Sequence, residues 1–386
     1  MNAIVKDLEK DKALMNEWFT HMHRNPELSM KEEKTAAFIA ETLKGFDGVE
    51  VETGVGKYGI VGSLKVGDGD KVIGLRADFD ALPIQEVNDL DYKSEVKGVS
   101  HLCGHDGHTT MLLAAAKRLS ETKNFNGTVR FIFQPAEETM EGGPAMIEDG
   151  LFDRFPVDTV YGMHNMPGLE KGKLYFTEGA TMAAVDNWEV EITGKGGHGA
   201  FPEHAIDPVV AGSSLVMAMQ SIVARNVAPS HSAVVTIGAF QAGAAGNVIA
   251  HSAILRFSIR TTTPEDRKLV LGNVRRLIKT QAEGFGCTWE IREGQPGAVL
   301  VNDPEETRQA AQIARDAFGE QDVFEDGPTY LGSEDFAFML QQRKGTYCFV
   351  GNGPTEFVHH PNYVFDRDIL PVGAAYWVAL TEGLLR

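Results

Sequence analysis

The spacing of apolar residues at the start of the chain predicts two helices. Between positions 4 and 44, hydrophobic residues recur at roughly helical intervals, and the polar run RNPE at 24–27 interrupts the pattern once. Ser29, followed by Glu32, resembles a capping box, in which two side chains satisfy backbone amides at a helix start. We therefore expect the second helix to begin at this pair.

Later runs of apolar residues predict buried strands, and polar side chains follow several of them. The predicted strands are residues 59–66, 71–77, 128–133 and 157–161. Asp78 and Asp80 follow the second strand. The pair Glu137-Glu138 follows the third, and His164 follows the fourth. Ligands collect at the carboxyl edge of the strands in α/β sheets, so we expect Asp78, the Glu137-Glu138 pair and His164 to converge on one site.

The central part of the chain shows the order strand-helix-strand-strand-helix-strand. These elements are residues 188–193, 207–225, 233–241, 250–260, 264–283 and 288–292. The order is that of the ferredoxin-like split βαβ unit, which forms a complete small domain. We therefore predict an α/β protein with a larger domain made of residues 1–186 and 299–386, interrupted by an inserted domain of residues 187–298.

Composition and charge narrow the class of partner. The chain has 386 residues, 43% of them hydrophobic, and a formal net charge of −18. This charge argues against nucleic acid or an anionic membrane as a partner, because both need a basic patch. No run of about 18 apolar residues suggests a membrane span, and the charged N-terminal stretch does not resemble a signal peptide. Three separated cysteines do not form a disulfide framework, so we expect a cytoplasmic location.

The stretch SHLCGHDGH, residues 100–108, contains the richest chemistry. It combines one cysteine, three histidines and one aspartate, and it precedes a helical pattern from about His108 to Ser120. Its glycines, Gly104 and Gly107, allow the backbone to turn tightly. A thiolate and imidazoles at the start of a helix suit a divalent transition metal such as zinc, manganese or cobalt. The alternative is a polar turn with incidental histidines.

Candidate metal ligands come from this stretch, from the predicted strand ends and from a loop near the end of the chain. They are Cys103, His105, Glu138, His164 and His359. This is more than one tetrahedral zinc ion needs, and two ions that share a bridging ligand would use the set better.

The adjacent carboxylates Glu137 and Glu138 require separate roles. Neighbouring side chains at a strand end point in different directions, so one can bind metal while the other faces the substrate. A free carboxylate beside activated water acts as a general base in hydrolysis and then as an acid toward the leaving amine. The alternative is a solvated acidic turn.

Several motifs together resemble the metallo-aminoacylase and carboxypeptidase family of di-metal exopeptidases, and within it the hippurate hydrolase and indole-acetyl-amino-acid hydrolase branch. They occur in the family's order along nearly the whole chain: HRNPELS at 23–29, RADFDALP at 76–83, CGHDGH at 103–108, FQPAEE at 133–138, GMHNMPG at 162–168, GGHGAFP at 196–202, AGNVI at 245–249, GSEDF at 332–336 and HHPNYVFD at 359–366. The resemblance implies a mixed-sheet catalytic domain with an inserted βαββαβ lid that also forms dimers.

The resemblance assigns roles to the candidate residues. It implies two divalent ions (zinc, manganese, nickel or cobalt) held by the five candidate ligands, with Glu137 as the general base. It selects His359 rather than His360 as the ligand, and it gives Asp78 the task of orienting a histidine or the base. Arg76 stands where much of the wider family has a metal-binding histidine, so His105 and His164 are the expected substitutes, and Cys103 the expected replacement for a bridging carboxylate.

The inserted domain is expected to complete the site. The resemblance implies that His198 of GGHGA is the lid histidine that stabilises the tetrahedral oxyanion, often across a dimer interface. Asn247 and Arg260 match positions that bind the substrate carboxylate. His198 could instead be a polar loop residue, and Arg260 could simply end its strand. A homodimer or homotetramer formed through the lid is expected.

The leading interpretation is a metal-dependent amidohydrolase that cleaves the amide bond of N-acyl-L-amino acids such as hippurate. Metal-activated water would attack the acyl carbon, with Glu137 as base, to release a carboxylic acid and a free amino acid. The alternatives are a dipeptidase or carboxypeptidase on the same scaffold, or a non-catalytic metal-binding protein.

Overall fold

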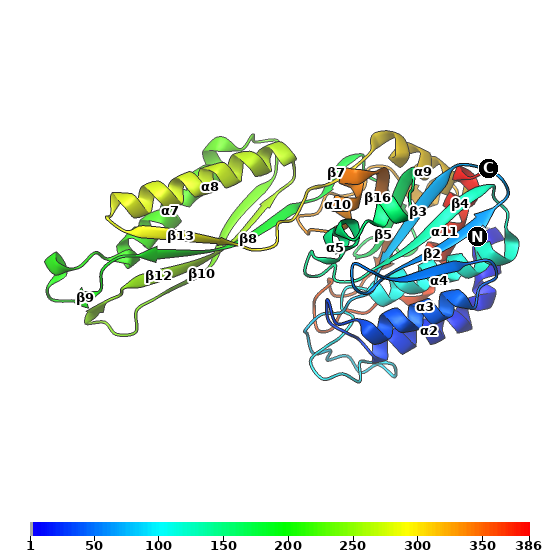
Figure 1. Cartoon of the computed structure of the whole chain (residues 1–386), viewed down its shortest axis with the longest axis horizontal. Helices are drawn as coiled ribbons and strands as arrows, with labels where there is room; N and C mark the ends of the chain where they lie inside the picture. The colour runs from blue at the N-terminus through cyan, green and yellow to red at the C-terminus, as the bar shows by residue number, and fades with distance from the viewer. Residues whose placement is uncertain (1–2) are drawn as a thin grey trace. The chain divides into compact units, whose positions relative to one another are not determined.

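The computed structural model describes residues 3–386, which fold into two units (Figure 1). The first unit consists of the described residues up to Thr181 together with Val301–Thr329 and Asp335–Arg386. The second consists of Met182–Leu300 and the short segment Tyr330–Glu334. The chain enters the second unit along the short strand β7 (Gly179–Met182) and leaves it along β14 (Leu300–Asn302), and it crosses again at each end of Tyr330–Glu334.

An eight-stranded mixed sheet forms the centre of the first unit. In spatial order its strands are β1 (Glu50–Val55), β2 (Gly59–Val66), β4 (Gly127–Gln134), β3 (Val72–Asp78), β5 (Thr159–Pro167), β16 (Lys344–Gly353), β6 (Leu174–Tyr175) and β15 (Val323–Phe324). The four strands β4, β3, β5 and β16 are parallel to their neighbours within this group. These four strands are almost entirely buried. Strands that helices cover on both faces have continuous apolar runs, because neither face meets water. Their carboxyl ends therefore open at one edge of the sheet.

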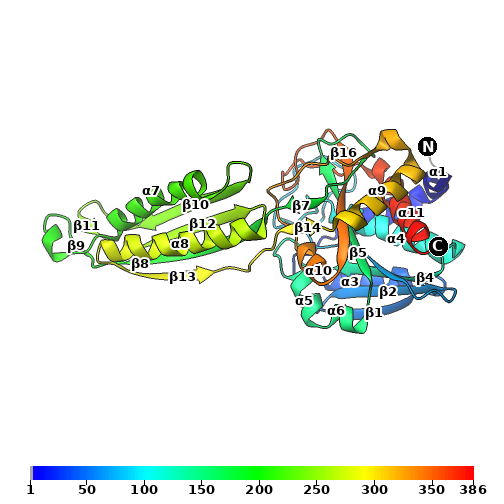
Figure 2. The ribbon, with the colours of Figure 1, turned by 90° about the horizontal axis from the view of Figure 1, so that it is seen from above.

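Helices enclose this sheet. They are α1 (Ala3–Leu8), α2 (Lys12–Arg24), α3 (Glu33–Lys44), α4 (His105–Thr122), α5 (Gly142–Glu148), α6 (Leu151–Arg154), α9 (Pro304–Phe318), α10 (Phe336–Gln342) and α11 (Leu370–Leu384). Of these, α4 and α11 are buried along most of their length and pack against each other in the main hydrophobic core (Figure 2). The start of α4 is thus fixed by the core of the unit.

The predicted capping box at the start of α3 is wrong. Glu32 occupies the N-cap position, but its side chain makes no capping hydrogen bond. Instead, Glu32 is fully buried and its Oε1 accepts a hydrogen bond from the Ala136 amide at 2.8 Å, while the Ser29 hydroxyl donates to Asp80 at 2.7 Å. Both side chains find partners in distant segments, and these tertiary bonds replace the local ones that the motif predicts.

The second unit has the predicted βαββαβ topology. Its elements are β8 (Ala184–Thr193), α7 (Pro208–Asn226), β10 (Ala233–Ala242), β12 (Ser252–Thr261), α8 (Pro264–Gly284) and β13 (Thr288–Glu293), with the short pair β9 (Gly197–His198) and β11 (Val248–Ile249). The strands form an antiparallel sheet in the order β10-β12-β8-β13, and α7 and α8 lie side by side on one face of it (Figure 1). Side chains along β12 alternate between more and less buried, as expected for a sheet covered on one face.

Within the described residues, α7 is long and apolar enough to cross a membrane by length and composition alone. A core helix of a soluble domain passes the same test. Ala211, Leu215, Met219 and Ile222 on this helix are buried in the core of the second unit. The helix therefore gives only weak evidence of a membrane span.

Candidate metal centre

The loop before α4 and the first turn of that helix direct the cysteine and histidine donors inward. The helix begins at His105 rather than near His108 as the sequence pattern predicts. Gly104, directly before it, has φ 102°, and a Cβ there would lie 2.1 Å from the side-chain oxygen of Asn165. Only glycine fits this turn, and with it both Cys103 and His105 are buried.

Cys103, His105 and His164 form a first group of potential ligands, with donor atoms within 4.8 Å of one another. The Cys103 Sγ lies 3.3 Å from His164 Nε2. The sequence pattern ends the strand before His164, but β5 continues to Pro167, so the histidine lies inside a buried strand. Its Nδ1–H donates to the Asn165 carbonyl at 2.5 Å, which leaves Nε2 toward the thiol.

Cys103, Glu138 and His359 form a second group of the same kind. His359 Nε2 lies 3.3 Å from Glu138 Oε2, and the His359 amide donates to the Leu102 carbonyl at 2.7 Å. The loop after β16 is therefore attached directly to the loop before α4. Both His359 and His360 are exposed, but His360 belongs to neither group. Because Cys103 is a member of both groups, its sulfur lies where two neighbouring ions could share it.

The two aspartates after β3 orient different histidines. Asp78 Oδ1 accepts from His108 Nδ1 at 2.6 Å, and Asp78 is further held by the buried Arg76 guanidinium at 2.8 Å. Asp80 Oδ1 lies 3.0 Å from His105 Nδ1, and its Oδ2 accepts from the Glu138 amide at 3.0 Å. Asp80 therefore holds two proposed ligands, although sequence reasoning gave it no role. Its position two residues after Asp78 at a strand end was the available signal.

Unpaired buried atoms at this site fit a bound cation. Among the described residues, His105 Nε2 and Glu138 Oε1 are buried and have no hydrogen-bond partner. Leaving such an atom unpaired costs about 1–3 kcal/mol. Because the unpaired atoms belong to side chains of both donor groups, divalent metal ligation accounts for them, and the thiol, imidazole and carboxylate donors suit a transition metal.

The charges around Cys103, His105 and His359 also favour a bound cation. Burial and then the Glu138 carboxylate raise the pKa of the Cys103 thiol. Burial alone would lower the pKa of His105, but Asp78 and the Cys103 thiolate hold it well above its ordinary value. Burial likewise opposes protonation of His359, yet hydrogen bonds to Cys103 and Glu138 raise its pKa to about 10. These negative groups attract protons that a divalent ion can replace.

Glu137 lies beside the donor groups. Its exposed fraction is 6%, and its Oε2 lies 3.9 Å from His105 Nε2. Ligand atoms of His105, Glu137 and Glu138 all lie within 4.8 Å of one another. The adjacent glutamates therefore reach the same region, where Glu138 also contacts His359.

The three residues predicted in the inserted domain all belong to the second unit. His198 on β9 is exposed and pairs across the ladder with Val248. The Gly199 amide donates to the Asn247 carbonyl at 2.8 Å, so His198 and Asn247 lie in neighbouring loops. Arg260 lies near the end of β12 and donates to the Leu331 carbonyl at 2.6 Å.

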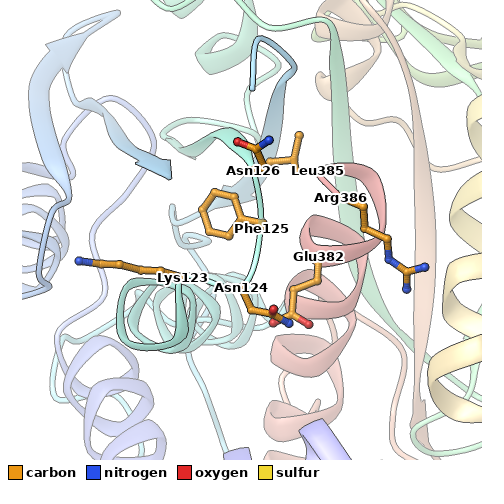
Figure 3. A pocket seen from close by; sticks show the side chains of 7 residues that line it. All are labelled: Lys123, Asn124, Phe125, Asn126, Glu382, Leu385 and Arg386. Carbon is orange, nitrogen blue, oxygen red and sulfur yellow. The ribbon is translucent and has the colours of Figure 1, made fainter. Parts of the chain in front are cut away.

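A separate surface hollow lies at the opposite end of α4. Figure 3 shows its lining, which comes from the segment after α4 and from the end of α11: Lys123, Asn124, Phe125, Asn126, Glu382, Leu385 and Arg386. The helix has 18 residues, so its two ends are separated by about 27 Å. This hollow is therefore not part of the donor cluster.

The fold and the cluster define the class of protein. Thiol, imidazole and carboxylate donors converge at the strand ends of a mixed sheet, on a site that is buried at Cys103, His105 and His164 and open at His359, next to a carboxylate able to accept a proton. This is the arrangement of a metallohydrolase.

Comparison with known proteins gives the family. The pattern of Peptidase family M20/M25/M40 matches residues 74–383, and the chain belongs to this family. It is 45% identical to the hippurate hydrolase of Campylobacter jejuni over 95% of each chain. It is 36% identical to an IAA-amino acid hydrolase of Arabidopsis thaliana, covering 95% of this chain and 84% of that one.

A solved structure supports the same placement. The fold matches a dinuclear metal-binding peptidase of family M20 from Bacillus subtilis with a TM-score of 0.84 and 32% identity, covering 98% and 99% of the two chains. The predicted family and the predicted α/β fold class are thus confirmed, and the chain is a metal-dependent amidohydrolase.

Proposed function

We propose that this enzyme hydrolyses the amide bond of N-acyl-L-amino acids of the hippurate type, releasing a carboxylic acid and a free amino acid. The observation that carries this proposal is a complete donor set beside Glu137 in a chain 45% identical to a hippurate hydrolase along nearly its whole length. A non-catalytic metal-binding protein would have no use for a buried carboxylate at this position.

The proposed site holds two divalent ions. His105 and His164 would serve one ion, Glu138 and His359 the other, and the Cys103 sulfur would serve both. When bound, such ions polarise the scissile carbonyl and lower the pKa of water. Zinc, manganese, nickel and cobalt all suit these donors.

Glu137 is the proposed general base. Its carboxylate would accept a proton from the attacking water and then deliver it to the nitrogen of the departing amino acid. Asp78 and Asp80 would hold His108 and His105 in fixed orientations through their hydrogen bonds.

The second unit would act as a lid that supplies His198 to the oxyanion, and Asn247 and Arg260 to the substrate carboxylate. The length of β12 supports an arrangement in which two chains share each site. His198 and Asn247 precede the start of β12 at Ser252, whereas Arg260 is near its end, about 26 Å away at 3.3 Å per residue. One substrate of amino-acid size is too short to reach both places in one chain, so His198 and the neighbouring Asn247 would together serve the site of a partner chain, where they would meet that chain's Arg260.

Surface features of the second unit support a homodimer, or a homotetramer built from it. β10 lies at the edge of its sheet, and α7 beside it exposes Val209, Val210 and Met217, the last with an exposed fraction of 74%. Edge strands and apolar helix faces of this kind are covered in stable assemblies. With a net charge of −18, the proposed assembly acts on small molecules in the cytoplasm rather than on nucleic acid or a membrane.

The test is hydrolysis of a substrate panel by the purified full-length chain with each candidate metal. N-benzoyl, N-acetyl and indole-acetyl amino acids are compared with dipeptides and with peptides carrying a free C-terminus. Preferred cleavage of the N-acyl amino acids is expected. A higher kcat/KM for dipeptides or peptides would replace the proposal with a dipeptidase or carboxypeptidase.

A further inference from the structure

Glu32 is a buried carboxylate whose bond reaches the proposed active-site turn. It is fully buried although it directly precedes the exposed residue Glu33 at the start of α3. Its Oε1 accepts a hydrogen bond from the Ala136 amide at 2.8 Å, across 104 positions of sequence. Burying a carboxylate costs free energy unless the group is hydrogen-bonded or paired with a charge. The motif that contains Glu32 gives no local use for it, because its side chain does not cap α3.

The residue that Glu32 holds has an unfavourable backbone conformation. Ala136 has φ 51°, in the left-handed region that residues with a Cβ rarely adopt. Its carbonyl accepts hydrogen bonds from the amides of Glu141 and Gly142, so the chain folds back on itself immediately after β4. The turn therefore needs support from outside, and Glu137 and Glu138 follow directly from it.

Two buried carboxylates hold the two amides that flank Glu137. Glu32 accepts from the Ala136 amide, and Asp80 accepts from the Glu138 amide at 3.0 Å. Ser29, in the same short segment as Glu32, donates to the same Asp80 oxygen at 2.7 Å. The segment between α2 and α3 thus supports the glutamate pair at both sides.

We propose that Glu32 is a positioning residue of the amidohydrolase reaction, which fixes the left-handed turn at Ala136 and thereby aims Glu137 and Glu138. The inference rests on the proposed roles of Glu137 as general base and Glu138 as metal ligand. Without this acceptor, Ala136 would be free to return to a right-handed conformation, and both glutamates would then change direction.

The bond requires an acceptor atom rather than a negative charge. Burial and then the nearby Asp80 carboxylate raise the pKa of Glu32 to about 7, so the side chain is partly protonated near neutral pH. Its other oxygen, Oε2, has no hydrogen-bond partner among the described residues. A glutamine can therefore keep the acceptor at Oε1 and put its amide group where no bond is lost.

The test compares Glu32→Ala, which removes the acceptor, with Glu32→Gln, which keeps it. Glu33→Ala removes an exposed carboxylate from the same helix start and serves as the matched control. For each full-length variant, kcat and KM on hippurate are measured at saturating Mn²⁺, together with Zn²⁺ affinity by chelator competition and the thermal midpoint. Measurements are made well below the lowest thermal midpoint, so that all variants are folded.

Glu32→Ala is expected to lower kcat at least tenfold at full metal occupancy, to change KM less than threefold, and to weaken Zn²⁺ binding. Glu32→Gln and Glu33→Ala are expected to remain within threefold of the parent enzyme in all three quantities. The proposal is overturned if Glu32→Ala keeps kcat within threefold, or if Glu32→Gln loses as much as Glu32→Ala.

The metal measurement separates this inference from the proposed function. If the parent enzyme hydrolyses none of the panel substrates, the proposed function fails, and Zn²⁺ affinity alone decides the role of Glu32. Weaker binding in Glu32→Ala but not in Glu32→Gln then supports positioning of Glu138, and equal affinity in all variants overturns it.

Discussion

Replacing Asp80 by asparagine tests whether the residue that sequence reasoning missed controls the metal centre. Asp80 Oδ2 accepts two hydrogen bonds, from the Ser29 hydroxyl and the Glu138 amide, while Oδ1 lies 3.0 Å from His105 Nδ1. An asparagine is expected to keep its carbonyl oxygen at the position with two donors. Its amide group would then face His105 Nδ1–H, donor against donor.

The size of the effect follows from what remains around His105. Loss of a partner that orients a metal-binding histidine typically costs 10–100-fold in metal affinity or activity. The backbone carbonyl of residue 80 also lies 3.0 Å from His105 Nδ1 and survives the substitution. This carbonyl therefore still stabilises the tautomer in which Nδ1 carries the proton and Nε2 is free to bind metal. We expect the lower end of the range, a loss of about tenfold or about 1.4 kcal/mol.

The assay is Zn²⁺ titration of the metal-free protein against a chromogenic chelator, with kcat measured at full occupancy. Ser29→Ala is the control, because it removes one donor from Oδ2 but leaves the bond between Asp80 and His105 intact. Its Zn²⁺ affinity should change less than threefold. Unchanged affinity in Asp80→Asn, or an equal loss in Ser29→Ala, would refute the reasoning.

Three further predictions concern the proposed residue roles. Glu137→Gln should keep fold and metal content but lower kcat by about 10²-fold or more, as expected for loss of a general base; near-normal turnover in a metal-loaded variant would remove Glu137 from that role. Chelation should abolish activity, and Cys103→Ala should lower the metal content found by elemental analysis; a fully loaded and active variant would contradict the shared thiolate. Mixing inactive Glu137→Gln and inactive His198→Ala chains should restore some activity if His198 serves a partner's site, whereas no recovery after proven subunit exchange would mean that it does not.

The fold was largely predictable because its strands and helices have strong hydrophobic patterns. The continuous apolar runs correspond to β2, β3 and β4, and the order of elements in the second unit follows the predicted βαββαβ topology. β1 was not predicted, because its residues are mostly exposed and show no apolar run. The extension of β5 to Pro167 was also missed. Pairing with β16 continues through His164 and Asn165, which local patterning cannot detect.

The sequence predicted the side chains of the candidate site that would contact a cation, but not the residues that hold those side chains in place. Residue type and motif spacing identify side chains able to bind a cation, and the structure groups the donor atoms of all five candidate ligands within 4.8 Å in overlapping sets. Apart from the expected bond between Asp78 and a histidine, most supporting bonds were not predictable, because they join segments that are distant in sequence. The Ser29–Glu32 pair demonstrates this: its local pattern predicts a helix cap, but both side chains bond to residues more than 50 positions away.

The contacts behind the donors explain how the chain fixes the geometry of the site. His105 is held by Asp80, His164 by the adjacent Asn165 carbonyl, and the His359 backbone by Leu102. These bonds involve Nδ1 of His105 and His164 and the backbone amide of His359. The Nε2 atoms that face the site therefore remain free to bind a cation. The supporting groups come from strand ends and from the loop before α4, which the hydrophobic core holds. The orientation of the donors therefore follows from the folding of the first unit by itself.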